Sequence, residues 1–195
     1  WDLPESQISI FQDQQPISIG HFIVTPILSN HYEFPDPELR EKALGGNQVI
    51  DQPLVPPVKL LDYKMGGHYT LHITHPKGSI VIQGSAGYKN GTLDSLSADV
   101  LFMGIAGLGT QSEDYRQAYF GQMLDIIDPQ QVFLIHWDGF TAPIDGPLNS
   151  ECLLLEKYMP SKINVSFDAA IEAVTMRPDM NAHLLPRWKK VVLFE

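Results

Sequence analysis

Short apolar runs separated by polar turns dominate this chain, first in alternating patterns and later as continuous runs between helical patterns. The runs with strand character span residues 8–11, 16–19, 20–28, 68–75, 79–83, 98–105, 131–136 and 190–194. Apolar residues recur at helical spacing in residues 37–44, 113–127, 151–159 and 168–176. Strands that alternate with helices in the second half predict an α/β protein with a partly parallel sheet.

The helix over 113–127 has the strongest local signals. Apolar residues recur at helical spacing in Tyr119, Met123 and Ile127, which predicts one face packed on a core. The preceding Thr110-Gln111-Ser112-Glu113 fits a capping box, and Pro129 ends the helix. The stretch 47–57 contains three prolines and predicts a stiff loop, either a lid or a surface excursion.

Three polar residues follow apolar strands: His31, Ser85 and His136. The run that ends at His136 is apolar throughout, which is typical of a strand buried on both faces. Ligand sites of α/β sheets gather at the carboxyl ends of strands. If the three strands are neighbours, their loops open at one edge of the sheet. The alternative for His136 is a core histidine bonded to a carbonyl.

The strand at 68–75 carries further histidines. Because side chains alternate along a strand, His68 and His72 share one face and His75 lies on the other. Such a cluster is compatible with a metal site or with a solvated face, and the sequence favours the solvated face.

Composition narrows the classes of partner and compartment. The chain has 195 residues, 44% of them hydrophobic and 18% charged, so it can bury a real core. A net charge of −10 repels phosphate backbones and argues against nucleic acid. One cysteine, Cys152, excludes an internal disulfide, which fits the cytoplasm or the bacterial periplasm. No apolar run is long enough for a membrane span, and no signal peptide is visible.

The order of these features resembles the carboxyl-terminal part of a metallo-β-lactamase-fold hydrolase. The likeness rests on a strand ending near His31, a strand ending at Gly84-Ser85, the run 98–107, a helix, and the strand ending at His136. It implies an α/β fold, the αββα sandwich of that superfamily, of which this chain holds the later portion. It also implies that His31 is the middle histidine ligand of a zinc site, that His136 is the last, and that position 85 bridges two ions.

Two departures from that family change the expected chemistry. The motif His-x-His-x-Asp-His is absent, and the chain starts at Trp1, so we expect residues 1–195 to be the later part of a longer domain. Ser85 stands where the family has aspartate, and a hydroxyl is a poor ligand. Asp138 is a candidate orienting or catalytic carboxylate, and Asp94 and Asp99 are weaker candidates. One or two zinc ions are expected in the complete protein, and weak or no binding in this chain alone.

Two functions remain open. The first is a metal-dependent hydrolase of a small-molecule ester, lactone, amide or phosphoester. The second is a non-catalytic α/β binding or interaction module that has lost the metal site. The aromatic residues near the expected ligands are candidates for the wall of a substrate pocket or for ordinary packing: Tyr32, Phe34, Trp137 and Phe140.

Neither a serine hydrolase nor a nucleotide-binding loop is supported, since no Gly-x-Ser-x-Gly elbow occurs and the glycines of 104–109 have the wrong spacing. If the second sheet is missing, an apolar sheet face needs cover from other chain segments or from a homo-oligomer.

Overall fold

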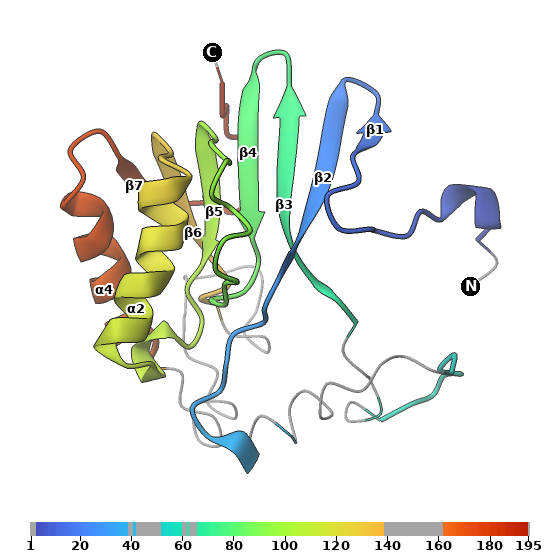
Figure 1. Ribbon diagram of the computed structural model, residues 1–195, viewed down its shortest axis with the longest axis horizontal. Coiled ribbons are helices and arrows are strands. Elements are labelled where there is room, and N and C mark those ends of the chain that lie inside the picture. Colours follow the sequence, from blue (N-terminus) through green and yellow to red (C-terminus); the bar gives the residue numbers. More distant parts are fainter. Residues whose placement is uncertain are drawn as a thin grey trace.

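The computed structural model describes residues 3–38, 41, 52–59, 62, 66–138 and 162–194. Seven strands form one mixed sheet in sequence order, β1-β2-β3-β4-β5-β6-β7. Their bounds are Ile17–Ile19 (β1), Phe22–Ser29 (β2), His68–His75 (β3), Gly78–Gln83 (β4), Val100–Gly104 (β5), Gln131–Ile135 (β6) and Asn181–Leu184 (β7). The fold class is therefore α/β, as the sequence predicts (Figure 1).

The type of strand pairing changes once across the sheet, from antiparallel to parallel. The pairs from β1 to β4 are antiparallel, whereas β4, β5, β6 and β7 are all parallel. The first half is thus built from hairpin-type pairing, and the second from crossovers that need helices. It follows that β2, β4, β5 and β6 all run in the same direction and end at one edge of the sheet, which we call the carboxyl edge.

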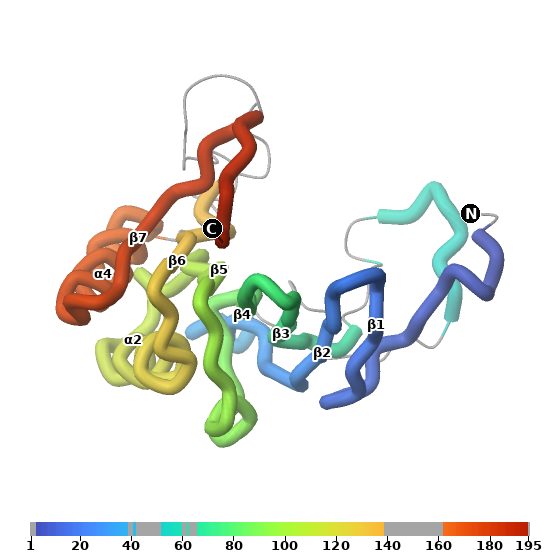
Figure 2. The backbone as a smooth tube through the Cα atoms, turned by 90° about the horizontal axis from the view of Figure 1, so that it is seen from above, coloured from blue at the N-terminus to red at the C-terminus, as the bar shows by residue number. Residues whose placement is uncertain are grey.

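Helices occupy one face of the parallel half. The regular helices are α2 (Glu113–Phe120) and α4 (Ile163–Thr175), and the short ones are η1 (Glu5–Gln7), η4 (Leu108–Thr110) and the π-helical turn η5 (Gly121–Ile126). Figure 2 shows α2 and α4 on the same side of the sheet. None of the helices in the described ranges is long and apolar enough to cross a bilayer.

The core lies between these helices and the sheet. Leu101, Met103, Val132 and Leu134 point from β5 and β6 into it and are almost fully buried. They meet Tyr119, Met123, Leu124 and Ile127 from the α2–η5 run and Ala170, Ala173 and Val174 from α4. Fully burying a leucine- or methionine-sized side chain contributes about 1.5–3 kcal/mol, so this cluster holds the parallel half together.

The opposite face of the sheet is also apolar. Strand register places on it a half-buried set of residues: Leu71, Ile73, Ile80, Ile82 and Phe102. Phe102 and Phe133 stack there with ring centres 5.1 Å apart. Phe11 contacts Tyr69 on the β3 side of this face, and Phe194 lies against Gly78 of β4. An apolar sheet face that needs cover is what the sequence predicts. Its cover by other chain segments or by a homo-oligomer stays a prediction.

Several predicted boundaries need correction. The N-cap of α2 is Ser112, whose hydroxyl accepts from the Tyr115 amide at 3.2 Å, and not Thr110, which ends η4. The last strand is β7 and not 190–194, because Asn181–Leu184 pairs with β6 while residues 191–194 form no ladder.

Two further predictions are wrong. Residues 8–11 form no strand. The last helix begins at Ile163, five residues before the predicted start at 168. The predicted helix at 151–159 lies outside the described residues, as does most of the one at 37–44.

Candidate functional site at the carboxyl edge

His31, Ser85 and His136 all lie at the carboxyl edge, because β2, β4 and β6 end there. In the sheet, β2 and β4 are separated by β3, and β4 and β6 by β5. With neighbouring strands about 4.8 Å apart, the three residues would be spread along the edge if each stayed above its own strand. The paths of the loops after β2, β4 and β6 therefore decide which of these three residues lie next to one another.

The segment after β2 crosses the edge toward β4. The Tyr32 amide donates a buried 2.7 Å hydrogen bond to the Ser85 hydroxyl. The same segment packs on Gly87, where an added Cβ would lie 2.3 Å from the Asn30 carbonyl oxygen and 2.4 Å from the His31 carbonyl carbon. Only glycine permits this approach, so the crossing brings His31 next to Ser85.

The loop after β4 is fixed by Gln83, whose side chain is buried in the sheet. Its amide nitrogen donates to the Ser85 carbonyl at 2.9 Å and to the Gly87 carbonyl at 2.7 Å, and its amide oxygen accepts from the Thr70 hydroxyl. The Gln83 amide nitrogen thus holds the loop that presents Ser85, while its amide oxygen ties the side chain to β3. The sequence treats Gln83 only as the end of an apolar strand, and nothing in its pattern indicates this role.

Tyr32 and two further tyrosines anchor the edge to the helices. The Tyr32 hydroxyl bonds to the Thr110 hydroxyl, and its ring lies under Gly107, whose φ of +83° suits glycine. Tyr115 donates to the Ala86 carbonyl at 2.9 Å, and Tyr119 donates to the Gly104 carbonyl at 2.8 Å. Burial raises the pKa of all three hydroxyls. They therefore remain protonated donors at neutral pH.

His31 lies among aromatic rings. Its Nδ1 is 2.9 Å from the Tyr32 carbonyl oxygen, which can only accept, so Nδ1 carries the proton. The ring stacks on Phe34 with centres 6.2 Å apart and meets the His68 ring at 4.6 Å. His31 is therefore held in one tautomer, and its nearest histidine is His68, which the sequence does not connect with it.

His68 and His72 share the helix-side face of β3, as strand alternation predicts. That face is half buried, and not the solvated surface that the sequence favours. The Nε2 atoms of both rings are shielded from solvent and have no hydrogen-bond partner among the described residues. Burial lowers the pKa of each ring.

His136 follows β6 in a left-handed backbone conformation, with a φ of +56°. That region costs a non-glycine residue roughly 1–2 kcal/mol, and such outliers gather at functional sites. Burial lowers the pKa of the half-buried ring, and the Asp138 carboxylate raises it by a smaller amount. The ring is consequently neutral at neutral pH, which is the form that binds metals.

The other candidates have more ordinary roles. Trp137 donates to the Leu134 carbonyl at 3.2 Å and packs against Phe167 of α4, which attaches α4 to the sheet. Asp99 precedes β5, at the opposite end of the strand from the carboxyl edge, and accepts from the Ser79 amide and hydroxyl. Asp94 and Asp138 are exposed, and Phe140 lies outside the described residues.

The histidines fit a zinc-type ion better than Ser85 does. Imidazole nitrogen is a common zinc ligand, whereas the Ser85 hydroxyl is already the acceptor for the Tyr32 amide. Among the described residues, no three His, Cys, Asp or Glu side chains lie close enough together to hold one ion. Whether His31, Ser85 and His136 act as ligands therefore remains a prediction.

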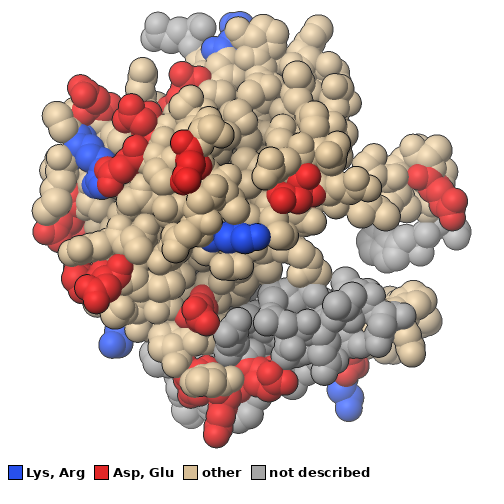
Figure 3. All heavy atoms as spheres, in the orientation of Figure 1, with Lys and Arg blue, Asp and Glu red and all other residues tan. Residues whose placement is uncertain are grey.

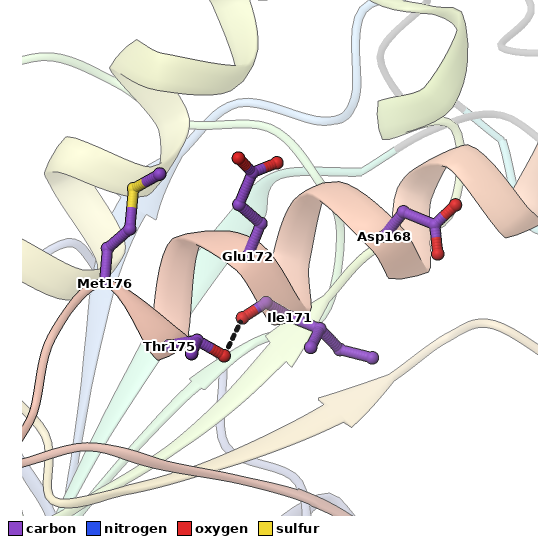
Figure 4. A pocket seen from close by; sticks show the side chains of 5 residues that line it. All are labelled: Asp168, Ile171, Glu172, Thr175 and Met176. Atoms are coloured by element: carbon purple, nitrogen blue, oxygen red, sulfur yellow. Dashed lines mark hydrogen bonds between the residues drawn. The ribbon is translucent and has the colours of Figure 1, made fainter.

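The surface away from this edge is acidic. Figure 3 shows carboxylates spread over the side that carries α2 and α4, and two of them are paired, Glu113 with Arg116 and Asp125 with Arg177. A hollow on α4 is lined by Asp168, Ile171, Glu172, Thr175 and Met176 (Figure 4). Thr175 donates within the helix to the Ile171 carbonyl at 2.7 Å. All five residues lie between Asp168 and the C-terminal end of α4, whereas the first turn of α4 contacts η4 through the bond from the Gly109 amide to the Ser166 hydroxyl.

No family model matches the chain, and no curated protein matches it either. Among solved structures, the chain is similar to the metallo-β-lactamase-fold protein YhfI from Bacillus subtilis, at 14% identity and a TM-score of 0.48, covering 91% of this chain and 52% of that one. It is also similar to CmlA, a diiron β-hydroxylase from Streptomyces venezuelae, at 12% identity and a TM-score of 0.47, covering 91% of this chain and 33% of that one. The chain thus spans about half and about a third of these structures.

Proposed function

We propose that the carboxyl edge of this chain forms part of a metal-dependent hydrolytic site. The observation that carries the proposal is the placement of His136, half buried and in a strained backbone conformation, on the same edge as His31. In such sites a bound metal ion supplies a hydroxide at neutral pH and stabilises the oxyanion of an ester, lactone, amide or phosphoester.

The chain's own residues have defined parts in this proposal. His31 and His136 provide imidazole nitrogens, and zinc accepts such ligands. Asp138, two residues after His136, is a candidate for orienting that ring. Tyr32 and Gln83 position the loops, because their hydrogen bonds fix the segments on either side of Ser85. Segments missing from this chain, or another chain, would complete the ligand set, and one or two zinc ions are the proposed cofactor.

A second candidate is a non-catalytic binding or interaction module. The observation that favours it is the 2.7 Å bond from the Tyr32 amide to the Ser85 hydroxyl. This bond gives Ser85 a structural use at the position where the resembled family has a bridging carboxylate. A module of this kind would keep the edge and its loops without the chemistry.

Metal content and hydrolysis distinguish the two candidates. The purified protein, reconstituted with zinc, would be assayed by mass spectrometry for bound metal and with chromogenic ester, lactone and phosphodiester substrates. We expect His136→Ala and His31→Ala to lower turnover at least a hundredfold. The matched control is His75→Ala, because His75 ends β3 at the opposite edge and should leave turnover unchanged. Metal-free protein without turnover on any substrate, or full activity in His136→Ala, would contradict the hydrolase.

A further inference from the structure

The closest histidine pair at the carboxyl edge is not one that the strand ends predict. His68 opens β3 and pairs in register with Ser29, the last residue of β2. His31 follows two residues later, and its ring centre lies 4.6 Å from that of His68, with an angle of 56° between the ring planes. The pair therefore sits where the chain leaves β2 and where it enters β3.

Each ring of this pair has a nitrogen atom of the kind that ligates a metal ion. His68 Nε2 is shielded from solvent and has no hydrogen-bond partner among the described residues. A buried polar atom left unpaired destabilises the folded state, so each one calls for a specific cause such as an ordered water or an ion. On His31, the bond from Nδ1 to the Tyr32 carbonyl places the lone pair of the neutral ring on Nε2.

The separation of the rings fits coordination of one ion. With Zn–N bonds of about 2.0–2.1 Å, a tetrahedral ion holds two imidazole rings with centres roughly 5 Å apart. The observed distance of 4.6 Å between the ring centres is close to this separation. Phe34 also contacts the His31 ring, with ring centres 6.2 Å apart, and limits the motion of that ring, which reduces the entropy lost on binding.

We propose that His31 and His68 together bind a divalent cation of the zinc, nickel and copper class, with His68 as a ligand. Imidazole nitrogens select these metals over magnesium and calcium, which prefer oxygen. The inference deepens the proposed function because it assigns a new ligand to the same edge, but it requires no hydrolysis.

His72 provides a matched control. It lies on the same strand and face as His68, and its Nε2 is likewise shielded and without a partner. Four residues of strand separate the two positions by about 13 Å, so His72 cannot share an ion with His31. An effect that follows burial or the loss of any histidine would appear in both variants, whereas an effect of ligation would appear only in His68 variants.

The test is a calorimetric titration of the full chain with ZnCl2 and with NiCl2 at pH 7.5 in a buffer that does not bind metals. We expect wild-type protein and His72→Asn to bind with affinities within twofold of each other. His31→Asn and His68→Asn should each lose at least tenfold. In parallel, the electron paramagnetic resonance spectrum of bound Cu²⁺ should show one imidazole nitrogen fewer in His68→Asn than in wild type.

Folding of each variant would be checked by circular dichroism, and His68→Gln would replace His68→Asn if the latter unfolds. Wild-type protein that binds neither metal, or unchanged affinity in the His68 variants, would overturn the pair. If His68 variants keep metal and turnover while His136→Ala loses turnover, the inference fails and the hydrolase stands. If both pair variants lose the metal and no substrate is hydrolysed by wild type, the pair stands and the hydrolase fails.

Discussion

The amide of Tyr32 donates a 2.7 Å hydrogen bond to the hydroxyl of Ser85, across 53 positions of sequence. Strands β2 and β4 are not neighbours in the sheet, because β3 lies between them. The bond therefore marks the place where the segment after β2 crosses to the loop after β4, and it explains why His31 lies beside Ser85.

Removing this acceptor should destabilise the protein. Ser85→Ala leaves the buried Tyr32 N–H without a partner, and such a loss costs about 1–3 kcal/mol. Urea denaturation followed by fluorescence would measure the change in the free energy of unfolding. The control is Ser97→Ala, an exposed position, where we expect a change of less than about 0.5 kcal/mol. Equal stabilities of the two variants would show that the hydrogen bond has no role.

A methyl group at Gly87 should disturb the same crossing. Its Cβ would lie 2.3 Å from the Asn30 carbonyl oxygen and 2.6 Å from that of His31, and backbone atoms cannot move aside cheaply. We expect Gly87→Ala to lower the free energy of unfolding by about 1–3 kcal/mol, the usual cost of overpacking.

Gly84→Ala is the matched control for Gly87→Ala, since a Cβ there meets nothing within 4 Å. Chemical shifts of residues 30–34 should move in Gly87→Ala and stay in place in Gly84→Ala. A Gly87→Ala protein as stable as wild type would mean that the segment approaches the loop less closely than described.

The strained backbone of His136 predicts a difference between two substitutions. With φ at +56°, alanine at this position retains the strain and glycine relieves it. His136→Gly should therefore be more stable than His136→Ala by about 1 kcal/mol, although both lack the imidazole. Thermal unfolding of both variants side by side would measure this, and His136→Ala being the more stable of the two would contradict it.

The buried histidines predict a loss of stability at mildly acidic pH. Burial lowers the pKa of His68 and His72 in the folded state, whereas the unfolded chain titrates near 6.5. Below about pH 6.5 the unfolded state binds more protons, so stability is complete above that pH and falls as pH drops toward the lowered folded-state values.

Unfolding curves at pH 7.5 and 5.5 test this dependence. Most carboxylates are ionised at both pH values, so the histidines dominate the difference. The variant His72→Asn should show a smaller loss between the two pH values than wild type. A loss that is the same in both proteins would assign the pH dependence to other groups.

Sequence patterns located most strands correctly because the burial of a strand is reflected in the apolar pattern of its own residues. The apolar runs of β4, β5 and β6 and the alternation of β3 state which residues face a core. The wrong strand predictions concern segments whose apolar pattern is weak or misleading. Strand β7 has the sequence Asn181-Ala182-His183-Leu184, and its partner β6 alone makes it a strand. Residues 191–194 have a better strand pattern, but no neighbouring strand offers them a ladder.

The start of helix α2 shows the same limit of prediction from local sequence patterns. Both Thr110 and Ser112 are good capping residues in sequence, and a three-residue spacing to Glu113 favours Thr110. In the folded chain Thr110 instead ends η4, where its hydroxyl donates to the Gly107 carbonyl at 2.8 Å and bonds to Tyr32. A distant tyrosine thus contributes to the choice between two caps, and no local pattern records it.

By itself, the sequence determined the α/β class, the strands that end shortly before His31, Ser85 and His136, and the shared face of His68 and His72. Each of these depends on the spacing of apolar residues and on the twofold alternation of a strand, which are local properties. The tertiary structure alone decided that His31 lies against His68, because the path of a loop across a sheet edge depends on one glycine, one serine hydroxyl and one buried glutamine amide far apart in the chain.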